Sequence, residues 1–262
     1  IFRITTWGES HGAGVGVVID GCPAGLPLSE EDIQKYLNRR KPGESKFTTQ
    51  RKESDQAEIL SGVFEGRTTG TPISILVRNQ DQKSRDYSNI MNTYRPGHAD
   101  YTFDAKYGFR DYRGGGRSSG RETIGRVAAG AVACKILESL GIQVMAYTKS
   151  IGPVSIPEQD YDYSVITDNT LYMPNNQYAE KASAYLEECI RSQDSSGGII
   201  ECRVDHMPAG IGETVFEKLD ANLAKAIMSI GAVKGFEIGD GFQAAKASGS
   251  QNNDAFSSNS DG

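Results

Sequence analysis

The sequence of 262 residues is poor in the features that mark membrane proteins, metal-binding proteins and disulfide-stapled proteins. Its four cysteines are widely separated and include no CxxC pair, which argues against a zinc ribbon, a thioredoxin-type motif and a disulfide scaffold. No apolar run approaches the roughly 18 residues that a membrane-spanning helix needs. Residues 1–10 carry a charge at Arg3 and no long apolar segment of the kind found in secretory signals. We therefore expect a cytoplasmic protein with reduced thiols, no metal site and no membrane partner.

Positive charge is also in deficit, but it is unevenly distributed. The chain has 28 Lys and Arg against 34 Asp and Glu, a net charge of −6, which is the opposite sign to that of most nucleic-acid-binding proteins. Yet residues 39–52 hold six cations and one anion, and residues 95–126 hold seven cations and four anions. Taken alone, either window is as consistent with a solvated surface as with a binding site. Together, in an acidic chain, they predict a focused site for a small anion and no nucleic-acid partner.

Hydrophobic patterning indicates strands that come in groups with helices between them. Alternation or apolar density predicts strands at 4–7, 14–20, 59–63, 73–78, 143–149 and 198–204. A helical period predicts helices at 30–39, 121–140, 178–191 and 213–230. This order favours an α+β fold over strict βαβ alternation. Residues 248–262, rich in Ser, Asn, Asp and Gly, are expected to form a loop or disordered segment.

The glycine-rich stretch 114–123 is the most informative motif. Ser119 and Glu122 form an S-x-x-E pattern, which predicts a helix that starts just after Ser119. Three glycines precede it, and free amides at a helix N-terminus bind anions such as phosphate. Arg117 and the hydroxyls of Ser118 and Ser119 would complete the site, because arginine binds phosphate oxygens in pairs. The alternative is an ordinary capped helix after a flexible loop.

Two of the three histidines lie in strong turn signals. His11 is within the glycine-flanked segment 8–12, and His98 is within the Pro-Gly turn 95–100. An imidazole exchanges protons near neutral pH, so two of them close to cation clusters suggest an acid–base pair that acts on an anionic ligand. Surface or hydrogen-bonded histidines are the alternative, and His206 is left without a role.

Residues 8–12 also match G-x-S-x-G, the nucleophile elbow of serine hydrolases, with Ser10 as the nucleophile. That motif needs a strand before the serine and a helix after it. The β-branched residues that follow, 14–20, predict a strand instead. A hydrolase is therefore the weaker alternative.

Six blocks along the chain, taken together, resemble the chorismate synthase family. Two are the segments 8–12 and 117–123, which are similar to the two N-terminal signatures of that family. The others are the segments 48–51, 95–100, 194–198 and 232–239. They occur in the family's order and span about residues 2 to 245, so the resemblance covers nearly the whole chain.

The resemblance implies a reaction, a cofactor and an architecture. The family converts 5-enolpyruvylshikimate 3-phosphate to chorismate and phosphate by a 1,4-elimination in the shikimate pathway to aromatic amino acids. It needs reduced FMN without net redox change, with NADPH as the upstream reductant. Its fold is a β-α-β sandwich with an internal duplication, and it assembles as a homotetramer. We expect residues 1–262 to form a single domain of this type that lacks the C-terminal part.

The resemblance also implies roles for individual residues. Arg40, Lys46 and Arg95 would hold the substrate. His11 would give a proton to the departing phosphate, and His98 would sit by the flavin ring and hold its protonation state. The residues expected to contact FMN are Arg117, Ser118, Ser119, Gly231 and Ala232.

Three departures from the family pattern affect this assignment. Lys46 stands where the family often has arginine, so the charge is kept but two-pronged binding is lost. Gly120 stands where alanine is usual. Family members continue beyond the position of Gly262 with a second flavin loop and an Arg-x-Asp motif whose aspartate is implicated in proton removal. A non-catalytic phosphate- or nucleotide-binding module is therefore a further alternative, beside the hydrolase.

The two histidines provide the first test. We expect His11→Ala and His98→Ala each to lower turnover by at least about 100-fold, because general acid–base catalysis contributes this much. Phosphate release from the substrate measures turnover, and circular dichroism checks that each variant is folded. Near-wild-type activity in both variants would contradict the assignment.

Overall fold

The computed structural model describes residues 2–41, 47, 54–80 and 91–256. The chain divides into two compact units, Ile1–Met207 and Pro208–Gly262. The strands of the first unit are β1 (Arg3–Gly8), β2 (Gly14–Asp20), β3 (Ala57–Ser61), β4 (Val63–Phe64), β5 (Arg67–Thr68), β6 (Ile73–Arg78), β7 (Gln143–Ile151), β8 (Val154–Ser155) and β9 (Gly198–Asp205). Its helices are α1 (Glu30–Arg40), α2 (Asp100–Tyr107), α3 (Thr123–Ser139) and α4 (Asn176–Arg191). Its 3-10 helices are η2 (Gly116–Ser118), η3 (Gly120–Glu122), η4 (Glu158–Asp160) and η5 (Tyr163–Asp168). The α+β class predicted from the sequence is confirmed.

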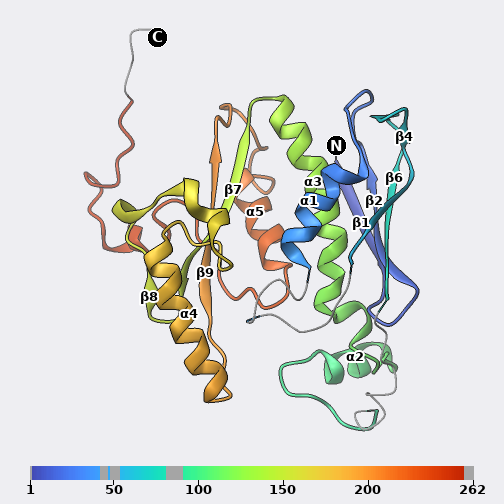
Figure 1. The fold of residues 1–262 in the computed structure, drawn as a ribbon. Coiled ribbons are helices and arrows are strands. Elements are labelled where there is room, and N and C mark those ends of the chain that lie inside the picture. Colours follow the sequence, from blue (N-terminus) through green and yellow to red (C-terminus); the bar gives the residue numbers. More distant parts are fainter. Residues whose placement is uncertain (1, 42–46, 48–53, 81–90, 257–262) are drawn as a thin grey trace. The chain divides into compact units, whose positions relative to one another are not determined.

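The main sheet of the first unit has the strand order β1-β2-β6-β3, with every pair antiparallel (Figure 1). Alternate residues of β6 are buried, as the sequence pattern predicts, and Ile75 lies opposite Val17 of β2. Consecutive strand residues point to opposite faces, so one face of the sheet carries these side chains into the core. The long hairpin β1–β2 places the turn that contains His11 at one end of this sheet.

Helices α1 and α3 cover the apolar face of this sheet. Helix α1 buries Ile33 and Leu37, and its first turn is closed because the backbone N–H of Ser29 donates to Asp32. Helix α3 buries Ile124 and a row of small residues, so it packs closely on β1, β2 and β6. Helix α3 also contacts β7, and the two helices lie between β7–β9 and the main sheet in Figure 1.

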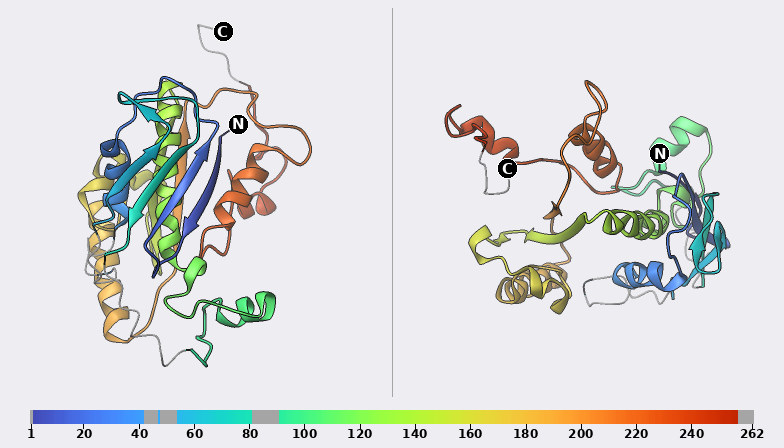
Figure 2. Two further views of the ribbon diagram at one scale, coloured as in Figure 1. Left: turned by 90° about the vertical axis from the view of Figure 1, so that its right-hand side faces the viewer. Right: turned by 90° about the horizontal axis from the view of Figure 1, so that it is seen from above.

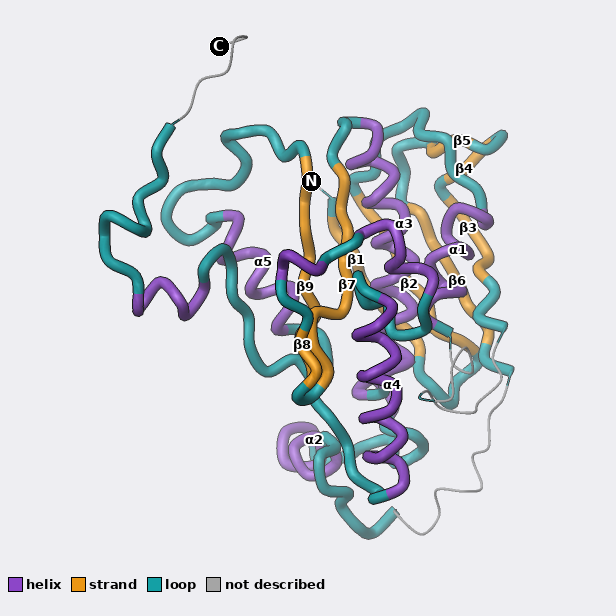
Figure 3. The backbone as a smooth tube through the Cα atoms, turned by 60° about the vertical axis from the view of Figure 1, so that its left-hand side comes forward, coloured by secondary structure: helices purple, strands orange, loops and turns teal. Residues whose placement is uncertain are grey.

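A second sheet, with strand order β8-β7-β9, carries its own small core. Ile156 and Met173 are buried against Ala179 and Ala182 of helix α4, which packs against β8. Figure 3 shows α4 running beside the β7–β9 pair. Three segments of this half, β7, β9 and α4, were predicted from the sequence to within a few residues, because their apolar periods are long and regular.

Several elements differ from the sequence-based expectation, among them the short strands β5 and β8, which were not predicted. The strand predicted at 59–63 is split at Gly62, whose φ of +80° turns the chain between β3 and β4. Helix α2 was not predicted, because its buried residue is Asp100 and it has no apolar stripe. The helix predicted at 213–230 is α5 (Leu219–Met228), which starts later since Val215 adopts a left-handed φ of +65°.

The second unit, Pro208–Gly262, contains helix α5 and the 3-10 helix η6 (Gly241–Lys246). None of its described side chains is buried, and residues 248–256 contain no helix or strand. Figure 2 gives two further views of the ribbon. In the part of the chain that the structure describes, no helix is both long and apolar enough to cross a membrane.

The close approach of α3 to the main sheet gives a stability prediction. A Cβ added to Gly125 would lie 2.9 Å from the carbonyl oxygen of Gly16 and 2.9 Å from Cγ2 of Thr6, whereas one added to Gly130 meets nothing within 4 Å. We expect Gly125→Ala to lower the free energy of unfolding by about 1–3 kcal/mol through overpacking. Gly130→Ala, on the same helix, should raise it by up to about 1 kcal/mol. Urea denaturation measures both, and equal effects would show that α3 does not pack this tightly.

Candidate functional site

His11 lies in the turn between β1 and β2. Gly8 ends β1 with a φ of +82°, and the N–H of Gly12 donates to the carbonyl of Glu9 at 3.1 Å, which closes the turn. Ser10 and His11 are only 5% and 8% exposed, and Ser10 Oγ lies 3.1 Å from His11 Nδ1. The turn therefore holds a histidine inside the protein with one ring nitrogen oriented by a hydroxyl.

The glycine turn predicted to bind anions packs directly on this imidazole. Gly114, Gly115 and Gly116 all have positive φ values, of 70°, 88° and 53°. A Cβ added to Gly114 would lie 2.2 Å from Cε1 and 2.3 Å from Nδ1 of His11. No side chain fits at Gly114, so glycine is required there both by the backbone conformation and by the close approach.

The next residues tie the glycine turn to the main sheet. Arg117 donates to the carbonyl of Gly8 at 2.8 Å, to the carbonyl of Thr6 at 3.2 Å and to Thr6 Oγ1 at 2.6 Å. Ser118 Oγ donates to the carbonyl of Gly115 at 2.7 Å. The arginine predicted to contact a phosphate thus stabilises the end of β1 in this structure.

The start of α3 differs in detail from the predicted capping box. Ser119 Oγ accepts a hydrogen bond from the N–H of Arg121, but the chain first forms η3. The carboxylate of Glu122 accepts from Thr6 Oγ1 at 2.8 Å, so it faces β1 rather than the backbone of Ser119. The neighbouring strand supplies a better-placed donor, and this tertiary contact replaces half of the capping box.

The amides of this turn were predicted to be free to bind an anion, but several of them donate hydrogen bonds within the turn. The N–H groups of Ser118, Ser119, Arg121 and Glu122 donate to acceptors inside the turn. These four amides are therefore already paired inside the turn.

Arg40, predicted to hold substrate, lies against the start of α3. It is the last residue of α1, and it donates to Thr123 Oγ1 at 3.2 Å and to the carbonyl of Gly120 at 3.4 Å. Its guanidinium also lies 3.0 Å from the carboxylate of Asp55. Burial lowers the pKa of Arg40, and the carboxylate of Asp55 opposes that shift. Two predicted site segments, distant in sequence, thus meet here.

Arg95 approaches the same glycine turn from another loop. A Cβ added to Gly115 would lie 3.9 Å from Nη2 of Arg95. The guanidinium forms a two-pronged ion pair with Asp100, with Nε 2.9 Å from Oδ2 and Nη2 3.0 Å from Oδ1. His98 belongs to the same loop, where its N–H donates to the carbonyl of Arg95 at 3.3 Å, and its side chain is exposed.

The structure does not place three other predicted site residues beside His11 and the glycine turn. Lys46, with the segment 48–51, lies outside the described residues. Gly231 and Ala232 follow α5 in the second unit, where Ala232 has a φ of +70°. The left-handed conformation of a non-glycine residue marks a tight turn there.

Acidic side chains beside the glycine turn change its electrostatics. A Cβ added to Gly116 would lie 3.3 Å from Oε2 of Glu9 and 3.3 Å from Cβ of Asp111. Burial, and then the neighbouring Asp111, raises the pKa of Glu9, while Arg117 and Arg113 lower it. The environment of the turn is thus a balance of cations and carboxylates.

The sequence did not single out two residues that hold these parts together. Asp55 is fully buried between Arg40 and Arg121, and Asn79 donates to the backbone of the His11 turn. Asp55 follows the cation-rich window 39–52, and that position is the one signal that could have pointed to it. Nothing in the sequence marks Asn79.

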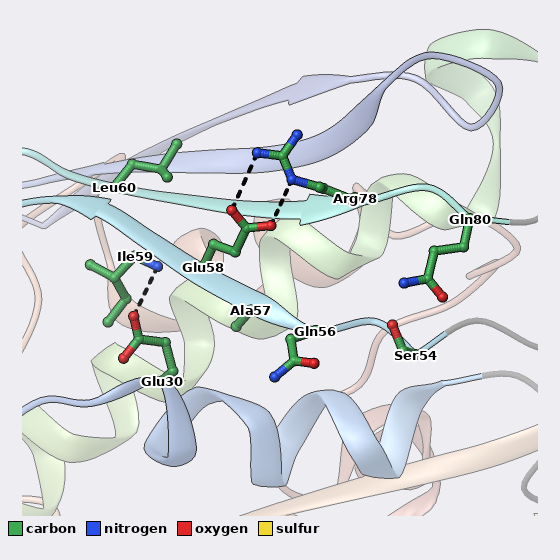
Figure 4. Close-up of a pocket in the computed structure, with 9 residues that line it drawn as sticks. All are labelled: Glu30, Ser54, Gln56, Ala57, Glu58, Ile59, Leu60, Arg78 and Gln80. Atoms are coloured by element: carbon green, nitrogen blue, oxygen red, sulfur yellow. Dashed lines mark hydrogen bonds and ion pairs between the residues drawn. The ribbon is translucent and has the colours of Figure 1, made fainter.

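A surface groove along β3 is separate from this group. Figure 4 shows the side chains that line it, including the paired Glu58 and Arg78 and the carboxylate of Glu30 that accepts from the N–H of Ile59. None of the predicted site residues lines it. Among the residues that the structure describes, no group of three or more His, Cys, Asp or Glu could hold a metal ion.

The G-x-S-x-G match does not have the setting of a nucleophile elbow. The turn that contains Ser10 joins strand β1 to strand β2, not to a helix. This local structure agrees with the strand predicted after the motif and removes the basis for a serine hydrolase.

The structure thus places a buried histidine, a glycine turn and arginines from the end of α1, from the loop before α2 and from η2 on an α+β scaffold. Known proteins with the same sequence pattern identify the family. The family profile for chorismate synthase matches residues 2–262. The chain is 70% identical to the chorismate synthase of Agathobacter rectalis over 256 residues, which are 98% of this chain and 70% of that protein. It is 55% identical over 262 residues to the chorismate synthase of Chloroflexus aurantiacus, covering 100% of this chain and 71% of that one.

A solved structure agrees with these matches. A crystal structure of chorismate synthase superposes with a TM-score of 0.81 and 36% identity, and the match covers 97% of this chain and 73% of that one. The chain therefore belongs to the chorismate synthase family of lyases, as its sequence motifs indicated. The chain spans about seven tenths of the length of the relatives given above.

The Arg95–Asp100 pair predicts a dependence of stability on pH. Hydrogen bonds from Arg95 hold the pKa of Asp100 down to about 2, below the roughly 3.9 of an unfolded chain. A lowered folded-state pKa stabilises the protein above about pH 4, and this contribution is lost as the pH falls towards 2. We expect the stability gap between wild type and Asp100→Asn to be larger at pH 6 than at pH 2.5, measured by thermal unfolding. An equal gap at both values would contradict the pairing.

Proposed function

We propose that this chain converts 5-enolpyruvylshikimate 3-phosphate to chorismate and phosphate by a 1,4-elimination with reduced FMN. The observation that carries the proposal is the buried His11 packed on a glycine turn, with Arg117 in the same segment and with Arg95 and Arg40 reaching that segment from two others. An imidazole held in place beside a segment that arginines contact is suited to protonate an anionic leaving group.

The substrate explains why an acidic chain concentrates its cations. Two carboxylates and a phosphate carry about four negative charges, of which phosphate alone contributes about 1.5 to 2. Leaving such charges unpaired in a closed site costs several kcal/mol per ion. We assign substrate binding to Arg40 and Arg95 and, by resemblance, to Lys46. His11 passes a proton to the phosphate as its C–O bond breaks, and Ser10 orients the imidazole through Nδ1.

The donor set around the glycine turn fits a flavin phosphate. Arg117 is about one third exposed beside the hydroxyls of Ser118 and Ser119, and arginine and hydroxyl donors are the usual ligands of phosphate. We assign these residues, with Gly231 and Ala232, to FMN, and we assign to His98 the protonation state of the flavin ring. Reduced FMN supplies electron density for the elimination, and NADPH is its upstream reductant.

The resemblance also supports a finer architecture and assembly. We propose that residues 1–262 belong to a single domain of the β-α-β sandwich type with an internal duplication. We propose a homotetramer located in the cytoplasm.

A flavin and phosphate assay tests the function. Under reducing conditions with FMN and 5-enolpyruvylshikimate 3-phosphate, we expect a change in the flavin spectrum together with stoichiometric phosphate release. Spectral change without phosphate would favour a binding module over a lyase. Labelling of Ser10 by a fluorophosphonate would favour the hydrolase, and the absence of binding as well as release would refute the proposal.

A further inference from the structure

We propose that Asn79 is a positioning residue that holds the His11 turn in place, and that Arg121 and Asp55 connect it to Arg40. The inference rests on the proposed function, since it assigns the placement of the group that protonates the phosphate. Asn79 and Asp55 lie outside the sequence motifs, and their contacts with Arg121, Arg40 and the His11 turn carry the inference.

Asn79 spans the turn that carries His11. It follows β6, and its side-chain Nδ2 donates to the carbonyls of Glu9 and Gly12, each at 2.8 Å. Its backbone N–H donates to the carbonyl of Ala13 at 3.2 Å. Three donors from one residue therefore fix the backbone on both sides of His11.

Arg121 fixes the orientation of the Asn79 amide. Its Nε donates to Oδ1 of Asn79, so the oxygen of the amide must face the guanidinium and the nitrogen must face the turn. Arg121 is 8% exposed, and its Nη1 lies 3.0 Å from Oδ1 of Asp55. The guanidinium thus links the amide to a buried carboxylate.

Asp55 completes the connection to the substrate-binding arginine. It is 0% exposed, and its second oxygen lies 3.0 Å from Nη1 of Arg40. Its φ of +44° is a conformation that L-residues rarely adopt, and Asp is among the residues that tolerate it best. A carboxylate buried without partners is strongly destabilising, so its two guanidinium contacts fix Asp55, and through it both arginines.

These contacts form one continuous path from Arg40 to the His11 turn. Arg40 pairs with Asp55, Asp55 with Arg121, and Arg121 with Asn79, which donates to the turn. Each contact in this path is a short hydrogen bond or ion pair between planar groups, so the orientation of each side chain is restricted. The path therefore sets the position of the proton donor relative to the arginine that receives the anion.

The decisive variant is Asn79→Asp. It keeps the size of the side chain and the acceptor for Arg121, but it replaces the Nδ2 amino group, which makes both donations to the turn, by a carboxylate oxygen that repels the carbonyls of Glu9 and Gly12. We expect kcat to fall by about 100-fold with KM within about threefold of wild type, because a misplacement of about 1 Å has this effect on catalysis. Asn176→Asp, an exposed position on α4 whose acceptor role is also kept, is the matched control and should leave kcat unchanged.

A second measurement does not depend on turnover. Carbethoxylation by diethyl pyrocarbonate, followed by mass spectrometry, reports the accessibility of each histidine. In wild type we expect His11 to react much more slowly than the exposed His98 and His206. In Asn79→Asp the His11 rate should rise at least about fivefold relative to these two internal references, as a released turn exposes the imidazole. Asp55→Asn, which tolerates the left-handed backbone, should raise it as well.

The outcomes separate this inference from the proposed function. A folded Asn79→Asp with wild-type kcat and a wild-type His11 labelling rate would overturn the positioning role. A rise in labelling in Asp55→Asn alone would likewise overturn it, because the turn would then not depend on Asn79. A wild-type protein that releases no phosphate would refute the function, while the labelling rates would still decide whether Asn79 holds the turn.

Discussion

The contact on which the site depends is the packing of the His11 imidazole on the main chain of Gly114. At 2.2 Å from where a Cβ would stand, the ring leaves no room for any side chain. Two turns from distant parts of the chain are thereby locked face to face. The remaining contacts, from Arg117 to β1 and from Asn79 to the His11 turn, keep the two turns at this distance.

Charge in this protein is organised by pairing within the fold. Each arginine assigned to the anion also touches a group of the protein itself: Arg40 touches Asp55, Arg95 touches Asp100, and Arg117 touches backbone carbonyls. These partners hold guanidinium groups in fixed directions before any ligand arrives. Such preorganisation reduces the entropy that would be lost when a ligand binds.

The sequence predicts regular elements well and the connections between them poorly. Strands β2 and β6 match the predicted ranges because alternation with a buried face fixes both type and register. Helix α2 has no apolar stripe, and the start of α5 depends on a left-handed Val215, so neither follows from periodicity. At the site, glycine and histidine motifs are readable, whereas Asp55 and Asn79 act through contacts 66 and 70 positions away along the chain, to Arg121 and Glu9, which no local pattern encodes.

Helix α3 joins regions that the chain order keeps apart. Its 17 residues span about 25 Å, since each residue of an α-helix rises about 1.5 Å. One end adjoins Ser119 and the contacts of Arg40, and its flank touches β7 of the second sheet. Helix α3 therefore links the residues that contact Arg40 to the second sheet through one continuous hydrogen-bonded element.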